Sequence, residues 1–531
     1  MSKALTHPLL GEILPKSGDD VVQFLGLKYA SLENAFAESA LHVPEPGTID
    51  ASKHGPSVVS PQIACEMEFG LIQKSLELPE FTYSELDGLN LNITVPASIS
   101  KDQKLPVFVF LHGGGFGIGG NSWPQYDLAR FVQLSIEDKR PIVAININYR
   151  LGAFGFLTSK ELRDAGYPGN NGLRDQRVAF AWIKKNISGF GGDPENISVG
   201  GESAGGISTT LHLYSKQPQF TRAISFGGTG LLMKPLPAFI HENTYTTVLE
   251  VLGIIATSAE DRVAALLATP AEDFLTKLPP GLPLHPYVDG DIIPVPVTFA
   301  DISDPSTSVV PGKQWCRDLL IGDNELDASI LIGAMEGQGG SLAKNFMSSF
   351  TKSLASHTGV AEFIFSAYKI EESLSNDEAV LPVLRFATDI GFLAPTLTYA
   401  KGWERNSYVY CFNEPNPWEG RFKGHSCHIL DVAFLFQNYN DHLSNAQRQS
   451  AVNFAKDVIA FVNGQAPWTS FNSDNTVKVY GPSDGALEAV SFVLPGKGND
   501  KTRRRGAIFQ FVENPGLDVI SNAFSTFLSG Q

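Results

Sequence analysis

A serine between small residues has the setting of a nucleophile in this chain. Residues 201–205 read Gly-Glu-Ser-Ala-Gly and follow the short apolar stretch 197–200. This order predicts a strand, a sharp turn that carries Ser203 and the start of a helix, which together form a nucleophile elbow. Glycine at 201 and 205 leaves room where a Cβ would crowd the strand or the helix. We therefore expect Ser203 to form a covalent ester during acyl transfer, although a five-residue pattern is weak by itself.

A glycine-rich segment earlier in the chain supplies a second part of such a site. Residues 111–116 read Leu-His-Gly-Gly-Gly-Phe and follow the apolar run 106–110, which predicts a buried strand. Successive glycines let backbone N–H groups turn into one small space, where they stabilise an oxyanion. We expect Gly114, Gly115 and Ala204 to donate these hydrogen bonds. A phosphate-binding loop is not favoured, because no Lys-Ser or Lys-Thr pair follows the glycines.

Several longer motifs accompany these two segments. They lie at residues 148–157 (NYRLGAFGFL), 169–176 (GNNGLRDQ), 190–194 (FGGDP) and 288–291 (VDGD). With them, nearly the whole chain resembles the type-B carboxylesterases of the carboxylesterase/cholinesterase family. The resemblance implies an α/β-hydrolase fold with a large, mostly parallel central sheet and helices on both faces. It also implies a serine, acid and histidine in that order along the chain.

Three carboxylates compete for the role of the acid. The apolar segment 319–321 is followed by Gly-Asp-Asn-Glu-Leu-Asp-Ala at residues 322–328. The family usually has glutamate five residues after this glycine, and here Asp327 stands at that position. We expect Asp327 to be the acid, with Glu325 as the first alternative and Asp323 as the second. The two carboxylates that do not serve are expected to be solvated loop residues.

Two histidines compete for the role of the base. Residues 425–436 read His-Ser-Cys-His-Ile-Leu-Asp-Val-Ala-Phe-Leu-Phe, and His428 fits the family pattern around its histidine, whereas His425 does not. The implied mechanism has His428 take the Ser203 proton while Asp327 holds the imidazole. His112, beside the glycines, is expected to support the loop. Because the base must be neutral, the rate should rise as the pH passes the His428 pKa.

The residues that select a substrate are less sharply defined. Phe116 and Trp123 flank the glycine loop, and Leu231, Leu232 and Met233 lie where the family often builds its acyl pocket. For each of these residues alone, ordinary core packing is the favoured interpretation over a place in the pocket wall. Glu202 matches a family glutamate and could bias the local field or make a buried hydrogen bond. Residues 65–88 contain no tryptophan, so the cation–π platform that binds choline in the cholinesterases is missing.

The charge composition of the chain disfavours some classes of binding partner. The chain has 531 residues with 40 Lys and Arg and 56 Asp and Glu, a formal net charge of −16. An acidic surface disfavours nucleic acid and anionic membranes. The basic run at residues 501–505 is expected to be a solvated loop before a strand at 507–511. We find no metal-binding motif and expect no cofactor.

The location follows from the N-terminus and the cysteines. No apolar segment of signal-peptide length begins the chain, and no run of 18 apolar residues occurs in it. Gly88 stands where secreted relatives carry a cysteine, which leaves Cys65 without that partner. These observations favour a reducing compartment and predict a cytoplasmic protein, with a removed leader as the alternative.

The elements that must position these residues alternate along the chain. Apolar strands are expected near residues 106–111, 142–148, 197–200, 223–226, 319–321, 407–412 and 507–511, and helices at 172–187, 446–463 and 517–528. This alternation predicts an α/β fold with catalytic loops at the carboxyl ends of the strands. No linker divides the motifs, so one domain over residues 1–531 is expected.

The leading function is a serine carboxylic ester hydrolase acting on apolar small-molecule esters. The alternative is an acyltransferase or lactone-forming enzyme of secondary metabolism, in which an alcohol or amine captures the same acyl-enzyme. A lipase at lipid surfaces and a non-catalytic, cholinesterase-like binding protein are less favoured. The binding proteins typically lose a triad member, and here every role has a candidate residue. The oligomeric state is left open.

Overall fold

The centre of the molecule is a single large β-sheet. The computed structural model describes residues 4–99, 103–483, 488–491, 503–504 and 506–530, and within these residues the sheet has 13 strands. Its order is β1-β2-β3-β7-β9-β8-β10-β11-β12-β13-β14-β15, with β6 beside β2. The strands from β9 to β14 run parallel, and antiparallel strands flank them at both edges. The fold is therefore α/β with a mostly parallel sheet.

The strands have the following bounds: β1 Leu5–His7, β2 Gly11–Ser17, β3 Val21–Lys28, β6 Thr48–Ala51, β7 Asn90–Pro96, β8 Leu105–Leu111, β9 Val143–Ile147, β10 Gly192–Glu202, β11 Arg222–Phe226, β12 Asp318–Asn324, β13 Asn406–Phe412, β14 Thr476–Tyr480 and β15 Glu488–Ser491. Every residue of β9, β11 and β12 is buried. Parallel strands that are covered on both faces need such continuous apolar sequences. The apolar runs at 106–111 and 319–321 therefore predict strands correctly.

Six of the seven strands expected from the sequence are confirmed, and one is wrong. Residues 507–511 form a short 3₁₀ helix, Ala507–Phe511, which begins after Gly506 at φ 55°. A five-residue apolar run has no period long enough to separate strand from helix, so its context decides. Here the run leads through a kinked segment, in which Asn514 is extended, into α20, Leu517–Leu528.

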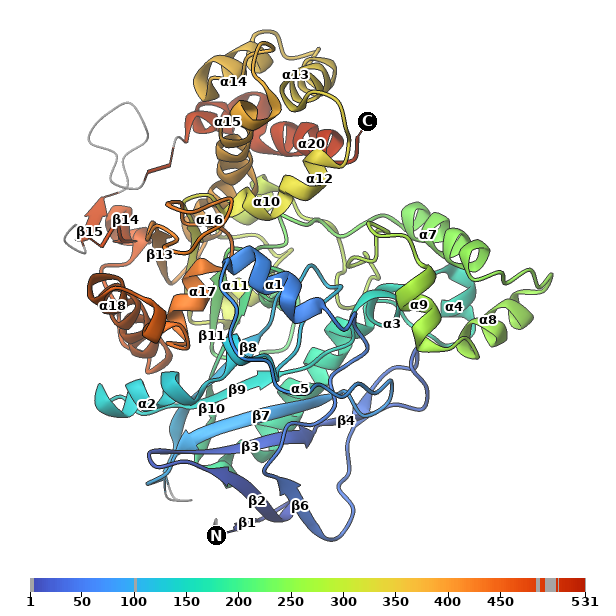
Figure 1. Ribbon diagram of the computed structural model, residues 1–531, viewed down its shortest axis with the longest axis vertical. Coiled ribbons are helices and arrows are strands. Elements are labelled where there is room, and N and C mark those ends of the chain that lie inside the picture. Colours follow the sequence, from blue (N-terminus) through green and yellow to red (C-terminus); the bar gives the residue numbers. More distant parts are fainter. Residues whose placement is uncertain (1–3, 100–102, 484–487, 492–502, 505, 531) are drawn as a thin grey trace.

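Helices cover both faces of the sheet. The three expected helices are present as α5 Asn171–Asn186, α18 Asn445–Val462 and α20. Other helices that bear on the site are α1 Ala64–Ile72, α6 Ala204–His212, α13 Leu342–Ser353, α15 Asn376–Thr388, α16 Ala394–Lys401 and α17 Leu430–Leu435. Figure 1 shows the N-terminal strands at the lower edge and α13, α14 (Val360–Tyr368), α15 and α20 gathered at the top. The C-terminal helix thus ends far from the first strands of the sheet.

One helical stretch is long and apolar enough to cross a membrane by length and composition. It runs from Asn376 to Lys401 through α15, a π-helical turn at Asp389–Leu393 and α16. In its most apolar window 83% of the residues are buried inside the protein. Side chains of this stretch, among them Phe386 and Leu393, belong to the main hydrophobic core. Its apolar character is therefore accounted for by packing within the fold.

The prediction that the basic run at residues 501–505 is a solvated loop is wrong for Arg504. Residues 501, 502 and 505 lie outside the described part of the chain, but Arg504 is 2% exposed. Its Nε donates to Asp323 Oδ2 at 3.0 Å and its Nη1 donates to Asn413 at 2.7 Å. A buried guanidinium needs a paired charge, and Asp323 on β12 supplies it. Arg504 is thus an internal anchor of the C-terminal segment rather than a solvated loop residue.

Candidate active site

Ser203 lies at the tip of a strained turn between β10 and α6. Its backbone has φ 51° and ψ −118°, a conformation that L-residues rarely adopt. A Cβ on Gly201 would lie 2.2 Å from the Gly205 carbonyl carbon, and one on Gly205 would lie 2.0 Å from the Leu111 oxygen. These approaches are the physical reason for glycine at both positions. Ser203 is half-buried between buried neighbours, so its side chain is directed into the cavity that it lines.

The glycine loop after β8 faces Ser203 across the same cavity. Gly114 and Gly115 have φ 94° and 59°, and both line this cavity. Among the described residues, no hydrogen bond uses the backbone N–H of either glycine. Ala204 is the first residue of α6, so its N–H has no acceptor within the helix. Three free donors therefore surround the position beside Ser203.

The side chain of His112 contacts the glycine loop and supports it. The imidazole Nδ1 lies 3.0 Å from the Gly113 oxygen, and the ring stacks on Tyr149 with centroids 4.4 Å apart. Burial lowers the pKa of His112 to about 4, so it stays neutral near pH 7. Its position fits the supporting role that the sequence predicts for it.

His428 and Asp327 meet across the carboxyl ends of neighbouring strands. Asp327 follows β12, and His428 lies in the loop between β13 and α17. The distance between His428 Nδ1 and Asp327 Oδ1 is 2.5 Å, and both side chains are buried. Backbone hydrogen bonds hold both residues in place. The backbone N–H of His428 donates to Ser329 Oγ, and the backbone N–H of Asn324 donates to Asp327 Oδ2.

The other two carboxylates of this segment point elsewhere. Glu325 pairs with His425 at 3.1 Å, and Asp323 pairs with Arg504. Asp323 has no exposed surface, which corrects the expectation that the unused carboxylates are solvated. Residues spaced by two would share a face within a strand, but β12 ends at Asn324 and Asp327 begins a 3₁₀ helix, Asp327–Leu331, so the backbone turns between the three carboxylates. Of the three, Asp327 is the one that contacts His428.

Glu202 adds a second negative group beside the imidazole. Its Oε1 lies 3.1 Å from His428 Nε2, but the two atoms are not aligned for a hydrogen bond. Burial lowers the pKa of His428, but the hydrogen bond and charge of Asp327 and the nearby carboxyl group of Glu202 outweigh burial and raise this pKa above its ordinary value. Burial also raises the pKa of Glu202. The carboxyl group of Glu202 therefore lies directly beside Nε2 of His428, the nitrogen that must accept a proton from Ser203.

A cavity of about 500 Å³ contains these groups. Leu231, Leu232 and Met233 line it as expected, together with Glu202 and Ser203. Phe116 and Trp123 do not belong to the lining, which corrects their assignment to the substrate pocket. Phe116 packs on Phe156 with centroids 4.7 Å apart, and Trp123 borders a different, smaller cleft. Both residues are core supports of the loop that they flank.

Most of the cavity wall comes from residues that the sequence did not single out. They are Met67, Glu68 and Leu71 of α1, Ile390, Gly391 and Phe392 of the π-helical turn, Ser521, Phe524, Ser525 and Leu528 of α20, and Ile118, Ile207, His285, Ile330, Leu331 and Ile429 from other segments. The ring of Phe392 also packs edge-on against His428 at 5.7 Å. No local signal distinguishes these apolar side chains from ordinary core residues. In the described residues, no group of three or more His, Cys, Asp or Glu could hold a metal ion.

Comparison with known proteins places this geometry in a family. A model described as "Carboxylesterase family" matches residues 6–480. The chain belongs to the carboxylesterase family. By that membership it is a carboxylic ester hydrolase of the serine hydrolase class, and its fold is that of the α/β-hydrolases.

Individual carboxylesterase-family relatives are moderately similar. Bile salt-activated lipase of Bos taurus is 29% identical over 79% of this chain and 70% of its own length. Lipase 2 of Diutina rugosa and para-nitrobenzyl esterase of Bacillus subtilis (strain 168) are each 33% identical, over 46% and 52% of their lengths. A solved PNB esterase structure superposes with a TM-score of 0.70 at 23% identity, covering 92% of this chain and 98% of that one. The structural likeness supports the fold.

Proposed function

We propose that this carboxylesterase hydrolyses apolar small-molecule esters through an acyl-enzyme on Ser203. The observation that carries the proposal is the shared cavity. Ser203, His428 and the two free glycine N–H groups line it, and the rest of its wall is largely aliphatic or aromatic. Pockets of this kind bury apolar ligands and orient them by a few polar groups.

The roles are assigned from the pairing of Asp327 with His428 and from the cavity that His428, Ser203 and the glycine loop line together. His428 Nε2 accepts the Ser203 proton as the serine oxygen attacks the ester carbonyl. Asp327 holds the Nδ1–H tautomer and stabilises the imidazolium that forms. Gly114, Gly115 and Ala204 donate to the oxyanion, and His428 then protonates the leaving alcohol. Water repeats these steps to release the acid and restore the free serine.

An active-site label tests the proposal directly. A fluorophosphonate should add once, to Ser203, and peptide mapping after intact-mass analysis should locate the adduct. Neither Ser203→Ala nor His428→Ala should form it. A wild-type protein that stays unmodified at neutral pH would contradict an assembled nucleophile.

Product analysis separates hydrolysis from acyl transfer. In the presence of water and a competing alcohol, a hydrolase should release mainly the free acid, whereas an acyltransferase should yield mainly the new ester. Activation by emulsified long-chain triglyceride would instead favour a lipase. We also propose a reducing, cytoplasmic location, which the buried free thiols of Cys65, Cys316 and Cys427 support.

A further inference from the structure

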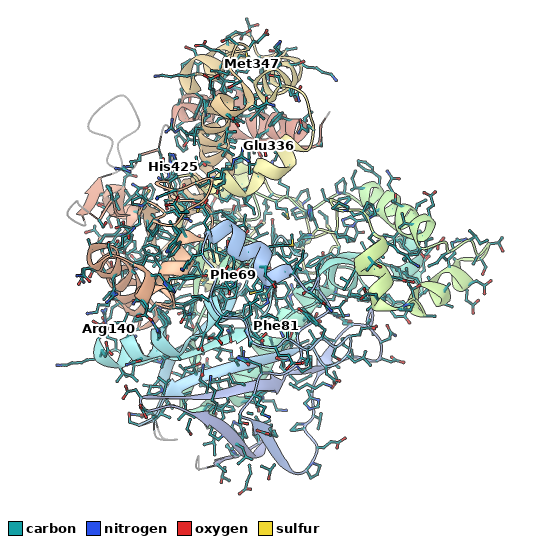
Figure 2. All side chains as sticks on the ribbon, viewed as in Figure 1. Phe69, Phe81, Arg140, Glu336, Met347 and His425 are labelled. Carbon is teal, nitrogen blue, oxygen red and sulfur yellow. The ribbon has the colours of Figure 1, made fainter. Side chains whose placement is uncertain are left out.

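A buried carboxyl group with no assigned role shares the cavity with Ser203. Glu68 belongs to α1, the helix on which Figure 2 labels Phe69. Its side chain is 2% exposed, yet it lines the same cavity as Glu202 and His428. The cavity wall therefore carries two acidic groups that face an otherwise largely apolar space.

The partners of Glu68 do not neutralise a negative charge. Gln125 Nε2 donates to Glu68 Oε1 at 2.8 Å, and both side chains are buried. No lysine or arginine in the described part of the chain pairs with Glu68. The titratable groups near it are Cys65 on its own helix, Tyr126, Tyr149 and Tyr439 from the packed segments, Glu202 and His428.

Burial without a paired cation favours the protonated form of a carboxyl group. Burial, followed by the charge of Glu202, raises the pKa of Glu68 to about 8, against the opposing hydrogen bond from Gln125. Glu68 therefore holds a proton at neutral pH and releases it in the mildly alkaline range. Two interacting carboxyl groups in one cavity do not ionise independently.

We propose that Glu68 is a specificity-determining residue whose proton sets the charge of the substrate cavity. With the proton bound, the cavity accepts neutral esters; with the proton released, it gains preference for esters that carry a cationic group. The inference rests on the ester hydrolysis proposed above. Its physical basis is that a charge in a water-poor, apolar cavity acts on a bound ligand more strongly than it would in water.

The experiment compares two esters of equal shape, one with a tert-butyl group and one with a trimethylammonium group in its place. The ratio of their kcat/KM values cancels the effect of His428 ionisation on general-base catalysis, which both esters share. We expect the ratio, cationic over neutral, to rise about tenfold between about pH 6 and pH 10 in the unmodified protein. A ratio that does not change with pH would overturn the proposal.

Two variants assign the change to Glu68. Glu68→Gln keeps the side-chain volume and removes the titrating proton, so the ratio should become independent of pH. Glu66→Gln alters an exposed glutamate on the same helix and should keep the rise. A rise that persists in Glu68→Gln would assign the charge to another group and overturn the inference. Thermal unfolding of both variants shows that they are folded.

A binding measurement separates this inference from the proposed function. The two alcohols of these esters can be titrated into the Ser203→Ala variant by calorimetry, where no turnover occurs. The ratio of their affinities should rise with pH as the kinetic ratio does. Hydrolysis without a pH-dependent ratio would refute only the role of Glu68. Absence of hydrolysis with a pH-dependent affinity ratio would refute only the proposed function.

Discussion

The role of each ionisable side chain here is decided by its partner rather than by its position in the sequence. Asp323, Glu325 and Asp327 lie within five residues, but they contact Arg504, His425 and His428 respectively. One of the three is thus in place to support a base, and the other two hold structural contacts. The family position alone left the choice between Asp327 and Glu325 open.

Replacing Asp327 by asparagine should separate these candidates. The amide cannot hold the required tautomer or stabilise the imidazolium, so kcat should fall about 10³–10⁴-fold with little change in KM. Glu325→Gln removes a carboxylate of the same segment that faces His425, and it should retain most of the activity. The measurement is steady-state hydrolysis of an uncharged chromogenic ester. Equal losses in both variants would argue against Asp327 as the specific partner.

Removing the charge of Glu202 should move the acid side of the pH profile. Glu202 contributes to the raised pKa of His428, and catalysis requires the neutral imidazole. Glu202→Gln lowers that pKa, so the base stays neutral to lower pH and the acid limb of kcat/KM should shift down by about one pH unit. Glu325→Gln is again the control and should leave the limb in place. A limb that does not move in Glu202→Gln would mean that Glu202 carries no charge in this pH range.

At the level of elements, the strand ends gather the reacting groups and the loops between them fix their orientation. Ser203 follows β10, the glycine loop follows β8, Asp327 follows β12 and His428 follows β13. These strands belong to one parallel run, in which β11 lies between β10 and β12, so their carboxyl ends meet at one edge of the sheet. The C-terminal segment adds to this arrangement because Arg504 is pinned to β12 through Asp323.

Breaking this anchor should destabilise the fold without touching the cavity. Arg504→Ala leaves the carboxylate of Asp323 buried and unpaired, which should cost about 3–5 kcal/mol of unfolding free energy. Arg503→Ala removes a neighbouring exposed arginine and should change the unfolding free energy by less than about 0.5 kcal/mol. Denaturant unfolding of the two variants gives the comparison. Similar stabilities would show that the pair contributes no net energy.

At the scale of the whole molecule, helices that are far apart in the sequence line one cavity. Helix α1 near the N-terminus and α20 at the C-terminus both line the space above Ser203. In Figure 1, α20 lies among α13, α14 and α15 at the end of the molecule opposite the N-terminal strands. The shape of the substrate space is therefore a property of the assembled fold.

Two phenylalanines of α20 test this arrangement. Phe524 lines the cavity, whereas Phe527 packs on Phe346 away from it. Both are nearly fully buried, so alanine at either position should cost about 3–5 kcal/mol of stability. Phe524→Ala should in addition raise kcat/KM for bulky esters relative to small ones, and Phe527→Ala should not. An unchanged ester preference in Phe524→Ala would place the substrate elsewhere in the cavity.

The sequence alone predicted the parts of this protein that local backbone constraints dictate. Small residues around Ser203 and three glycines after an apolar run mark tight turns, because no other residues fit there. Apolar runs indicated six strands of the sheet, and the resemblance selected His428 over His425. The short run at 507–511 was misread because its period is ambiguous and its context is the C-terminal helix.

Only the tertiary structure decided which charges meet and what surrounds the substrate. Arg504 reaches Asp323 across 181 residues, and His428 reaches Asp327 across 101 residues. Met67, Phe392 and Phe524 become neighbours of one cavity only when distant helices pack. Such contacts depend on how elements pack in space, and nothing in the spacing of the residues records them. Burial then sets the protonation of Glu68 and Glu202, because desolvation acts on a folded environment and not on a sequence position.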